Sequence, residues 1–143
     1  MQLKISSAVC TGTSHMEEEL PCQDCVAAKR WENYGGAALS DGAGSCRYAH
    51  CGAETIVETV LQYMEDNAEE LLSADQAFLS DRIIRKCLER LSQNEYDINE
   101  QAGTLIFCLI NSDGKYICGH LEQWIFCPPI FNNTRYRHAW QPD

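Results

Sequence analysis

Long apolar runs are missing from this chain of 143 residues. No stretch approaches the roughly 18–20 consecutive apolar residues of a membrane-spanning helix, and residues 1–6 lack the long apolar core of a secretion signal. The composition is otherwise that of a folded protein, because 45% hydrophobic and 22% charged residues suffice for one compact domain. We therefore expect a soluble, cytoplasmic protein without a membrane partner.

Basic residues are also scarce. The chain has 11 Lys and Arg residues against 21 Asp and Glu residues, and its formal net charge is −10. Such a chain repels the phosphate backbone that a nucleic-acid-binding protein must attract, so we expect no nucleic-acid partner. A basic cluster on one predicted helix is expected to be a solvated face that pairs with neighbouring acids. The cluster consists of Arg82, Arg85, Lys86 and Arg90.

Cysteine, in contrast, is abundant, with nine residues. An odd number without a secretion signal argues against a disulfide framework and favours reduced thiols. Cys22 and Cys25 have the spacing of metal ligands, and with Cys46 and Cys51 they leave a zinc-binding module as an alternative. The second pair has a different spacing, and neither pair lies in a recognisable zinc knuckle. A thioredoxin-type pair is disfavoured because a strand, not a helix, follows Cys25.

Three short segments near the N-terminus have the pattern of strands. They are residues 3–9, residues 25–31, which end at a turn over residues 33–36, and residues 37–40. The last strand stops at residues 41–45, DGAGS, which are too rich in glycine to continue a sheet.

Two amphipathic helices are predicted next. Residues 48–72 carry apolar side chains on one helical face, and a second helix follows Ser73 and extends to Leu91. Gln76, three residues after Ser73, completes the pattern of a capping box.

The remaining pattern is that of a β-hairpin. Residues 103–110 are apolar on both alternating faces, which predicts a central strand buried on both sides. The turn signal at residues 111–114 leads into a returning strand at residues 115–121. Residues 122–143 show no pattern of a regular element.

The most informative position is the end of the third strand. Asp41 would emerge at the strand end, and Gly42 would let the backbone turn and present its carbonyl group. Carboxylate, carbonyl and water oxygens are the ligands that Mg²⁺ and Mn²⁺ prefer. Paired ions of this kind activate water and hold a phosphoryl group during hydrolysis.

Five segments, taken in order, give this position a context. Together they resemble the bacterial branch of the metal-dependent PPM phosphatases, the protein phosphatase 2C family, from the N-terminus to Leu121. The segments are GTSH at residues 12–15, PCQD at 21–24, ALSDGAGS at 38–45, GTL at 103–105 and GHL at 119–121.

The resemblance implies an α+β fold, in which two antiparallel sheets form a β-sandwich flanked by helices. It also implies a signalling hydrolase that cleaves phosphoserine or phosphothreonine with a metal-bound water. Two Mg²⁺ or Mn²⁺ ions are implied, with Asp41 bridging them, Gly42 lending its carbonyl group and Asp24 holding an ion through water. The partner would be a phosphorylated protein.

The chain departs from the family pattern in two places. Ala43 stands where members often carry a histidine, so leaving-group protonation has no assigned residue, and His15 is a candidate for it. After Leu121 the pattern ends, and the expected aspartate ligands do not follow. We therefore expect residues 1–121 to be an incomplete phosphatase domain with a divergent tail at residues 122–143, and with weak or no activity alone.

Two further expectations follow from the missing strands. An uncovered sheet face and unpaired strand edges favour self-association. A domain without catalysis that binds phosphoproteins is the main functional alternative.

Overall fold

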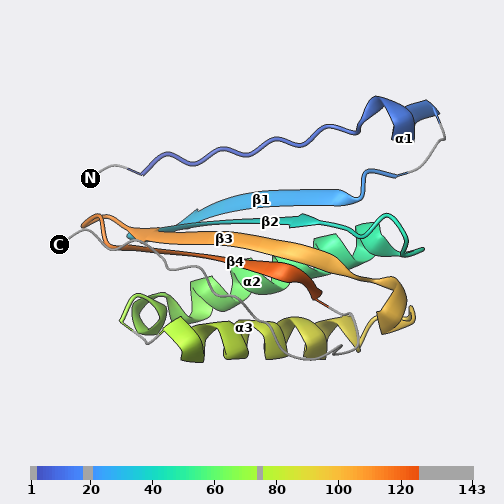
Figure 1. Cartoon of the computed structure of the whole chain (residues 1–143). Coiled ribbons are helices and arrows are strands. Elements are labelled where there is room, and N and C mark those ends of the chain that lie inside the picture. Colours follow the sequence, from blue (N-terminus) through green and yellow to red (C-terminus); the bar gives the residue numbers. More distant parts are fainter. Residues whose placement is uncertain (1–2, 18–20, 74–75, 126–143) are drawn as a thin grey trace.

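The computed structural model describes residues 3–17, 21–73 and 76–125 (Figure 1). Its elements follow in the order α1 (Thr13–Glu17), β1 (Asp24–Trp31), β2 (Tyr34–Asp41), α2 (Ala49–Leu71), α3 (Gln76–Leu91), the 3-10 helix η1 (Ile98–Glu100), β3 (Gly103–Asn111) and β4 (Tyr116–Ile125). The strands form one antiparallel sheet in the order β1-β2-β3-β4, so β2 and β3 are central, as predicted for residues 103–110. The fold is of the α+β class.

The sheet has two different faces. Helices α2 and α3 lie on one of them, and residues 3–12 run along the other (Figure 1). We call the second one the open face. The helical face holds the core, in which α2 buries the apolar positions that its sequence pattern predicted. The largest fully buried side chains include Ile56 and Met64 of α2, Ile83 of α3, and Leu105 and Leu109 of β3.

Helix α2 approaches the chain before β3 very closely. A Cβ atom at Gly52 would lie 1.9 Å from the backbone oxygen of Gln101, so only glycine fits there. The Gln101 side chain is fully buried, and its amide nitrogen donates to the carbonyl oxygens of Leu91 at 3.3 Å and Tyr96 at 3.0 Å. Its amide oxygen accepts a hydrogen bond from Asn94 at 2.6 Å. These bonds join the end of α3 to the start of β3.

Two local predictions were wrong. Residues 3–9 form no strand, and the Ile5 side chain instead packs over Gly35. The first hairpin turns at Glu32 and Asn33, between the paired residues Trp31 and Tyr34, so the two glycines after Tyr34 belong to β2. The capping box predicted at Ser73 and Gln76 involves side chains outside the described residues, and the Ser73 hydroxyl donates to the carbonyl oxygens of Glu69 and Glu70 in α2.

The open face differs from the expectation of a central strand buried on both sides. Ile106 is 55% exposed and its register partner on β2, Leu39, is 39% exposed. Within the described residues there is one sheet, so no second sheet covers these side chains. Strand β4 continues to Ile125, beyond the Leu121 at which the regular pattern was expected to end. Residues 126–143 lie outside the described residues.

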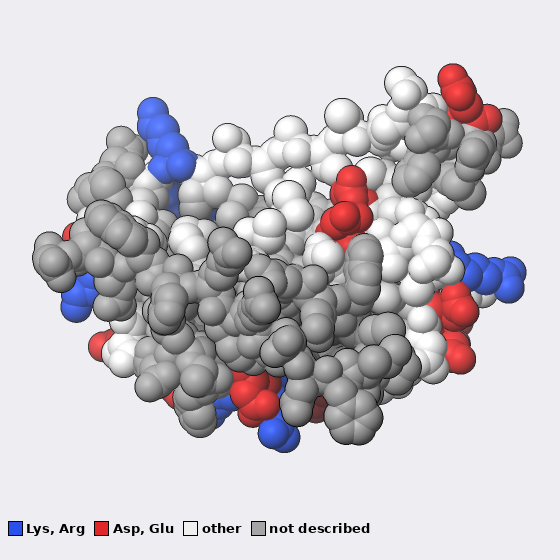
Figure 2. All heavy atoms as spheres, viewed as in Figure 1, with Lys and Arg blue, Asp and Glu red and all other residues white. Residues whose placement is uncertain are grey.

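The surface carries charge in small groups. On the face seen in Figure 2, acidic and basic side chains of the described residues lie in small groups near the rim of the molecule, and one acidic group lies nearer its centre. In the described part of the chain, none of the helices has the length and apolar character that crossing a membrane requires.

Candidate functional site

Two carboxylates meet at one end of the sheet. Strand β1 begins at Asp24 and β2 ends at Asp41, and the antiparallel register places these two residues directly opposite each other. Side chains opposite each other in an antiparallel pair have Cβ atoms about 4.5–5.5 Å apart and share one face of the sheet. The structure therefore brings together two of the residues that the sequence singled out.

The pair is electrostatically unfavourable when both groups are ionised. The pKa of Asp41 is raised above its usual value, first because partial burial disfavours the charge, then because of the hydrogen bond and the charge of Asp24. Among the described residues, no Lys or Arg forms an ion pair with either carboxylate. A bound divalent cation would remove this repulsion, so the donor set fits part of a Mg²⁺ or Mn²⁺ site.

Gly42 is enclosed by backbone on two sides. Its amide donates to the carbonyl oxygen of Gln23 at 3.0 Å, and a Cβ atom would lie 2.6 Å from that oxygen and 2.8 Å from the carbonyl oxygen of Ala49. Any larger residue would therefore push the end of β2 away from β1 and α2. The glycine keeps the two acidic strand ends together.

Thr104 holds the backbone of Asp41. Its hydroxyl accepts a hydrogen bond from the Asp41 amide at 3.0 Å, and the ladder of paired residues between β2 and β3 ends two residues earlier, at Leu39. The threonine side chain thus replaces a ladder bond at the strand end. Residue-level reasoning gave Thr104 no role, although it lies inside the GTL segment of the family pattern.

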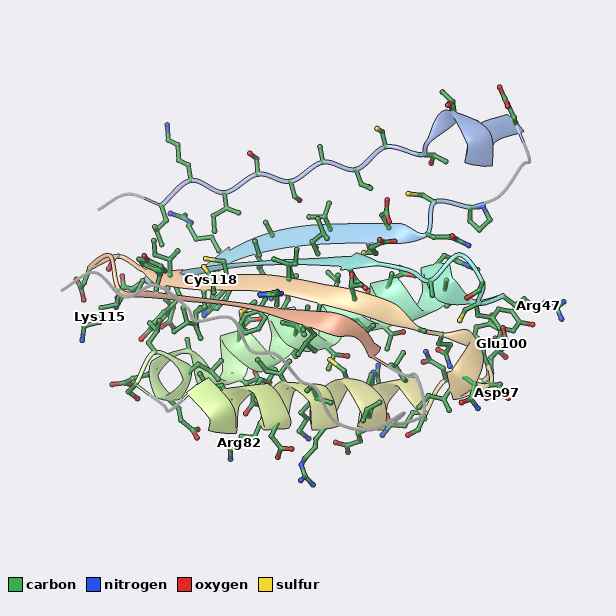
Figure 3. All side chains as sticks on the ribbon, in the orientation of Figure 1. Arg47, Arg82, Asp97, Glu100, Lys115 and Cys118 are labelled. Atoms are coloured by element: carbon green, nitrogen blue, oxygen red, sulfur yellow. The ribbon has the colours of Figure 1, made fainter. Side chains whose placement is uncertain are left out.

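The glycine-rich segment after Asp41 is tied to the η1 region. The amide of Ala43 donates to the carbonyl oxygen of Ala102 at 2.8 Å, and the amide of Tyr48 donates to that of Glu100 at 2.9 Å. The Glu100 carboxylate accepts a further bond from the Arg47 amide at 2.8 Å. Figure 3 labels Arg47 and Glu100 at this corner. The segment is therefore held at both ends by the chain that leads into β3.

A pocket of about 220 Å³ adjoins the carboxylate pair. Besides Asp24 and Asp41, its lining is mostly apolar and includes two residues of the N-terminal segment. The other lining residues are Ala8, Val9, Cys25, Val26 and Leu39. Solvent screens the repulsion between two carboxylates less beside an apolar wall than in bulk water.

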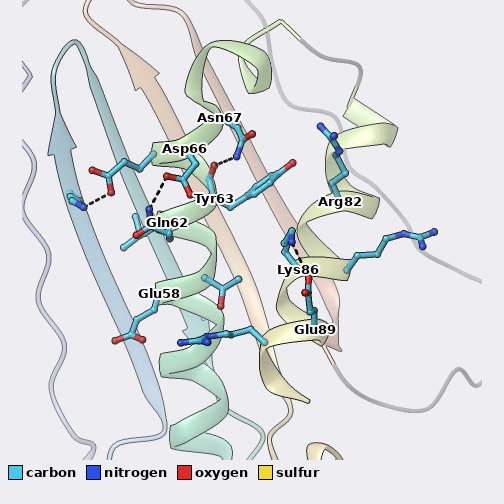
Figure 4. Close-up of a pocket in the computed structure, with 14 residues that line it drawn as sticks. Glu58, Gln62, Tyr63, Asp66, Asn67, Arg82, Lys86 and Glu89 are labelled. Atoms are coloured by element: carbon cyan, nitrogen blue, oxygen red, sulfur yellow. Dashed lines mark hydrogen bonds and ion pairs between the residues drawn. The ribbon is translucent and has the colours of Figure 1, made fainter. Parts of the chain in front are cut away.

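A larger groove, of about 1010 Å³, lies elsewhere, between α2 and α3 (Figure 4). The basic cluster lines it, and three of its members are paired with acids: Lys86 with Glu89 at 3.0 Å, Arg85 with Asp81, and Arg82 with Glu70. The expectation of a charge-paired helix face is confirmed, and the groove shares no residue with the carboxylate site.

Other candidates are not gathered into a metal site. His15 belongs to α1, and its side chain lies outside the described parts, so its role in proton transfer stays a prediction. Among the described residues, no three His, Cys, Asp or Glu side chains form a group that could hold a metal ion. The four cysteines of the zinc alternative therefore form no such cluster.

Comparison with known families decides the assignment. Residues 11–121 match the family model described as protein phosphatase 2C, and this range contains the carboxylate pair and the segments around it. The chain belongs to the protein phosphatase 2C family. Curated proteins give no match to the chain. In this phosphatase 2C chain the match ends at Leu121, inside β4. Membership of the bacterial branch stays a prediction.

Proposed function

We propose that this chain takes part in the metal-dependent hydrolysis of phosphoserine or phosphothreonine in proteins, as a member of the bacterial branch of the family. The observation that supports the proposal most directly is the pairing of Asp24 with Asp41 at one sheet end, without a cationic partner among the described residues. Bound Mg²⁺ or Mn²⁺ ions supply activation of water and neutralise charge on the phosphoryl oxygens.

The residues of the site have separate tasks in this proposal. Asp41, the carbonyl oxygen of Gly42 and Asp24 would hold the ions. Thr104 fixes the backbone of Asp41, and the apolar lining beside the pair reduces the access of bulk water. Positioning of this kind is the main contribution of a protein to phosphoryl transfer.

The described part supplies only some of the ligands. A hard divalent cation takes about six oxygen ligands, and a two-ion site needs carboxylates beyond a single pair. Among the described residues, no third acidic side chain joins Asp24 and Asp41. We therefore propose that residues 1–121 act as one part of a phosphatase domain, and that this chain alone binds a cation with weak or no turnover.

The test combines binding with catalysis. The purified chain and the variants Asp41→Asn and Asp113→Asn are titrated with Mn²⁺ by calorimetry and assayed on para-nitrophenyl phosphate. Asp113 is a matched control, because it is an exposed aspartate in the β3–β4 turn, which adjoins the opposite end of the sheet. We expect the wild type and Asp113→Asn to bind Mn²⁺ and Asp41→Asn to lose that binding.

The outcomes separate the parts of the proposal. Equal Mn²⁺ binding by the wild type and Asp41→Asn would overturn the metal site. Strong Mn²⁺-dependent hydrolysis that Asp41→Asn abolishes would retain the site and refute the claim of weak activity. Phosphopeptide binding without turnover, insensitive to Mn²⁺, would favour the alternative of a phosphoprotein-interaction domain in the cytoplasm.

Self-association is the second part of the proposal. Leu39 and Ile106 are register partners and both are exposed on the open face. A second copy can present the same pair around a two-fold axis, which buries four apolar side chains because the same surface of each copy forms the contact. Sedimentation should show dimers that dissociate in Ile106→Lys. A wild-type chain that stays monomeric at high concentration would contradict this arrangement.

A further inference from the structure

Strands β3 and β4 carry two cysteines that face each other. Cys108 and Cys118 are register partners in the antiparallel ladder. Cα atoms of directly opposite residues in such a ladder are about 4.5–5.5 Å apart. This separation falls inside the usual range of a disulfide, about 4.4–6.8 Å. The sheet therefore holds the two residues at a distance that a disulfide requires.

Both side chains lie on the open face. Leu105, Phe107 and Leu109 of β3 point into the core, so the alternation of the strand places Cys108 on the opposite side, together with Ile106. Gly119 lies against the Phe107 ring, which places its neighbour Cys118 on the open face as well. Cys118 is exposed, and Figure 3 labels it on β4.

The two thiols are close to each other. Burial first, then the hydrogen bond and the charge of Cys118, together raise the pKa of the Cys108 thiol to about 12. The two sulfur atoms are therefore within hydrogen-bonding reach. One thiol is accessible to a reagent in solution, while the other stays protonated beside it.

We propose that Cys108 and Cys118 form a redox-active dithiol that a hydroperoxide oxidises to an intrachain disulfide. The exposed Cys118, having lost its proton to solvent, attacks one oxygen of hydrogen peroxide. The O–O bond breaks, hydroxide leaves and takes up a proton, and Cys118 becomes a sulfenic acid. The Cys108 sulfur then attacks the Cys118 sulfur, the S–O bond breaks, and the Cys108 proton leaves with the hydroxide as water. Two thiols and one peroxide thus give one disulfide and two waters.

Other described cysteines lack this combination. Cys87 is buried in the core, and burial raises its pKa to about 12. Cys10 is exposed but has no register partner, because residues 3–12 pair with no strand. Cys25 lies on β1 opposite Ser40, not opposite a second cysteine. Position in the sheet, rather than cysteine content, selects the Cys108–Cys118 pair.

The test is a peptide map of the full chain. The reduced protein is treated with hydrogen peroxide, alkylated and digested with trypsin without reduction. Cys108 lies in the tryptic peptide 91–115, and Cys118 lies in the peptide 116–135 together with Cys127. We expect a loss of two free thiols per chain and a linked pair of these peptides, both reversed by dithiothreitol.

Variants identify the partner. Cys118→Ser should abolish the linked pair, and Cys127→Ser, which changes the other cysteine of the same peptide, should retain it. The same treatment in concentrated urea should yield less of this pair relative to other linkages, because the sheet register is lost. Linkage through Cys127, disulfide-linked dimers as the main product, or an equal yield in urea would each overturn the proposal.

Discussion

The close approach of α2 to Gln101 gives the most demanding prediction. In Gly52→Ala, the new Cβ atom would lie 1.9 Å from the Gln101 carbonyl oxygen and 2.6 Å from its carbon, all of them backbone atoms that no rotamer change can move. Reaching ordinary contact, which starts at 3.4 Å, requires a shift of the helix by about 1.5 Å.

Two opposing contributions set the magnitude. Alanine in place of glycine inside a helix stabilises by about 0.5–1 kcal/mol. Overpacking of a close-packed contact costs about 1–3 kcal/mol, and occasionally more, when backbone must move. Because 1.9 Å is far inside any real contact, we expect the clash to dominate and the free energy of unfolding to fall by about 1–3 kcal/mol.

The assay is urea unfolding followed by circular dichroism, with Gly44→Ala as the matched control. A Cβ atom at Gly44 would meet only the Gln23 side-chain oxygen, at 3.5 Å, so its stability should change by less than about 0.5 kcal/mol. A Gly52→Ala protein as stable as the wild type would refute the reasoning, because propensity alone would then decide the outcome. It would also mean that α2 and the start of β3 lie farther apart than described.

Three further predictions concern the residues around the site. Gln101→Leu leaves the Leu91 and Tyr96 carbonyl oxygens without the amide that serves them, and urea unfolding should show a loss of about 1–3 kcal/mol; an unchanged midpoint would contradict the buried network. Thr104→Val removes the acceptor of the Asp41 amide and should lower stability by about 0.5–1.5 kcal/mol, whereas Thr104→Ser should retain it; a loss in Thr104→Ser without a loss in Thr104→Val would show that the methyl group, not the hydroxyl, matters. Asp41→Asn should be more stable than the wild type in metal-free buffer at neutral pH, because the raised pKa of Asp41 means that its ionised form is disfavoured in the folded state. This difference should shrink as the pH falls through the raised pKa and vanish below the ordinary value of 3.8. Thermal unfolding across pH tests it, and a wild type that is the more stable of the two at neutral pH would argue against the repulsion.

The sequence patterns located the elements well where each had a long apolar period. Helix α2 and both strands of the β3–β4 hairpin lie close to their predicted positions, because burial on the helical face imposes the period that the pattern displays. The prediction of a strand at residues 3–9 was wrong because this segment lacks a pairing partner in the described part of the chain. Alternation shows that a segment can form a strand, but a strand also needs a partner, and no strand pairs with this segment in the described part of the chain.

Contacts between distant segments were beyond the reach of local patterns. The local pattern around Gly52 is that of an ordinary helix. Only glycine fits at position 52 because the backbone of Gln101, which lies 49 positions later, is so close. The same holds for Thr104 and Asp41, which are 63 positions apart. The resemblance to the family supplied Asp24 and Asp41 as a pair, and the register of β1 and β2 supplies the physical reason that they meet.

The carboxylate pair destabilises the sheet when both groups are ionised. Like charges directly opposite each other destabilise an antiparallel ladder, and here the repulsion remains without a cationic neighbour among the described residues. Two backbone restraints nevertheless hold the two strand ends together, namely the ladder itself and the enclosed Gly42, and the Thr104 hydroxyl fixes the backbone of Asp41 against β3. Local rules are broken in this way where function requires it, and in the proposed function a bound cation would turn the repulsion into affinity.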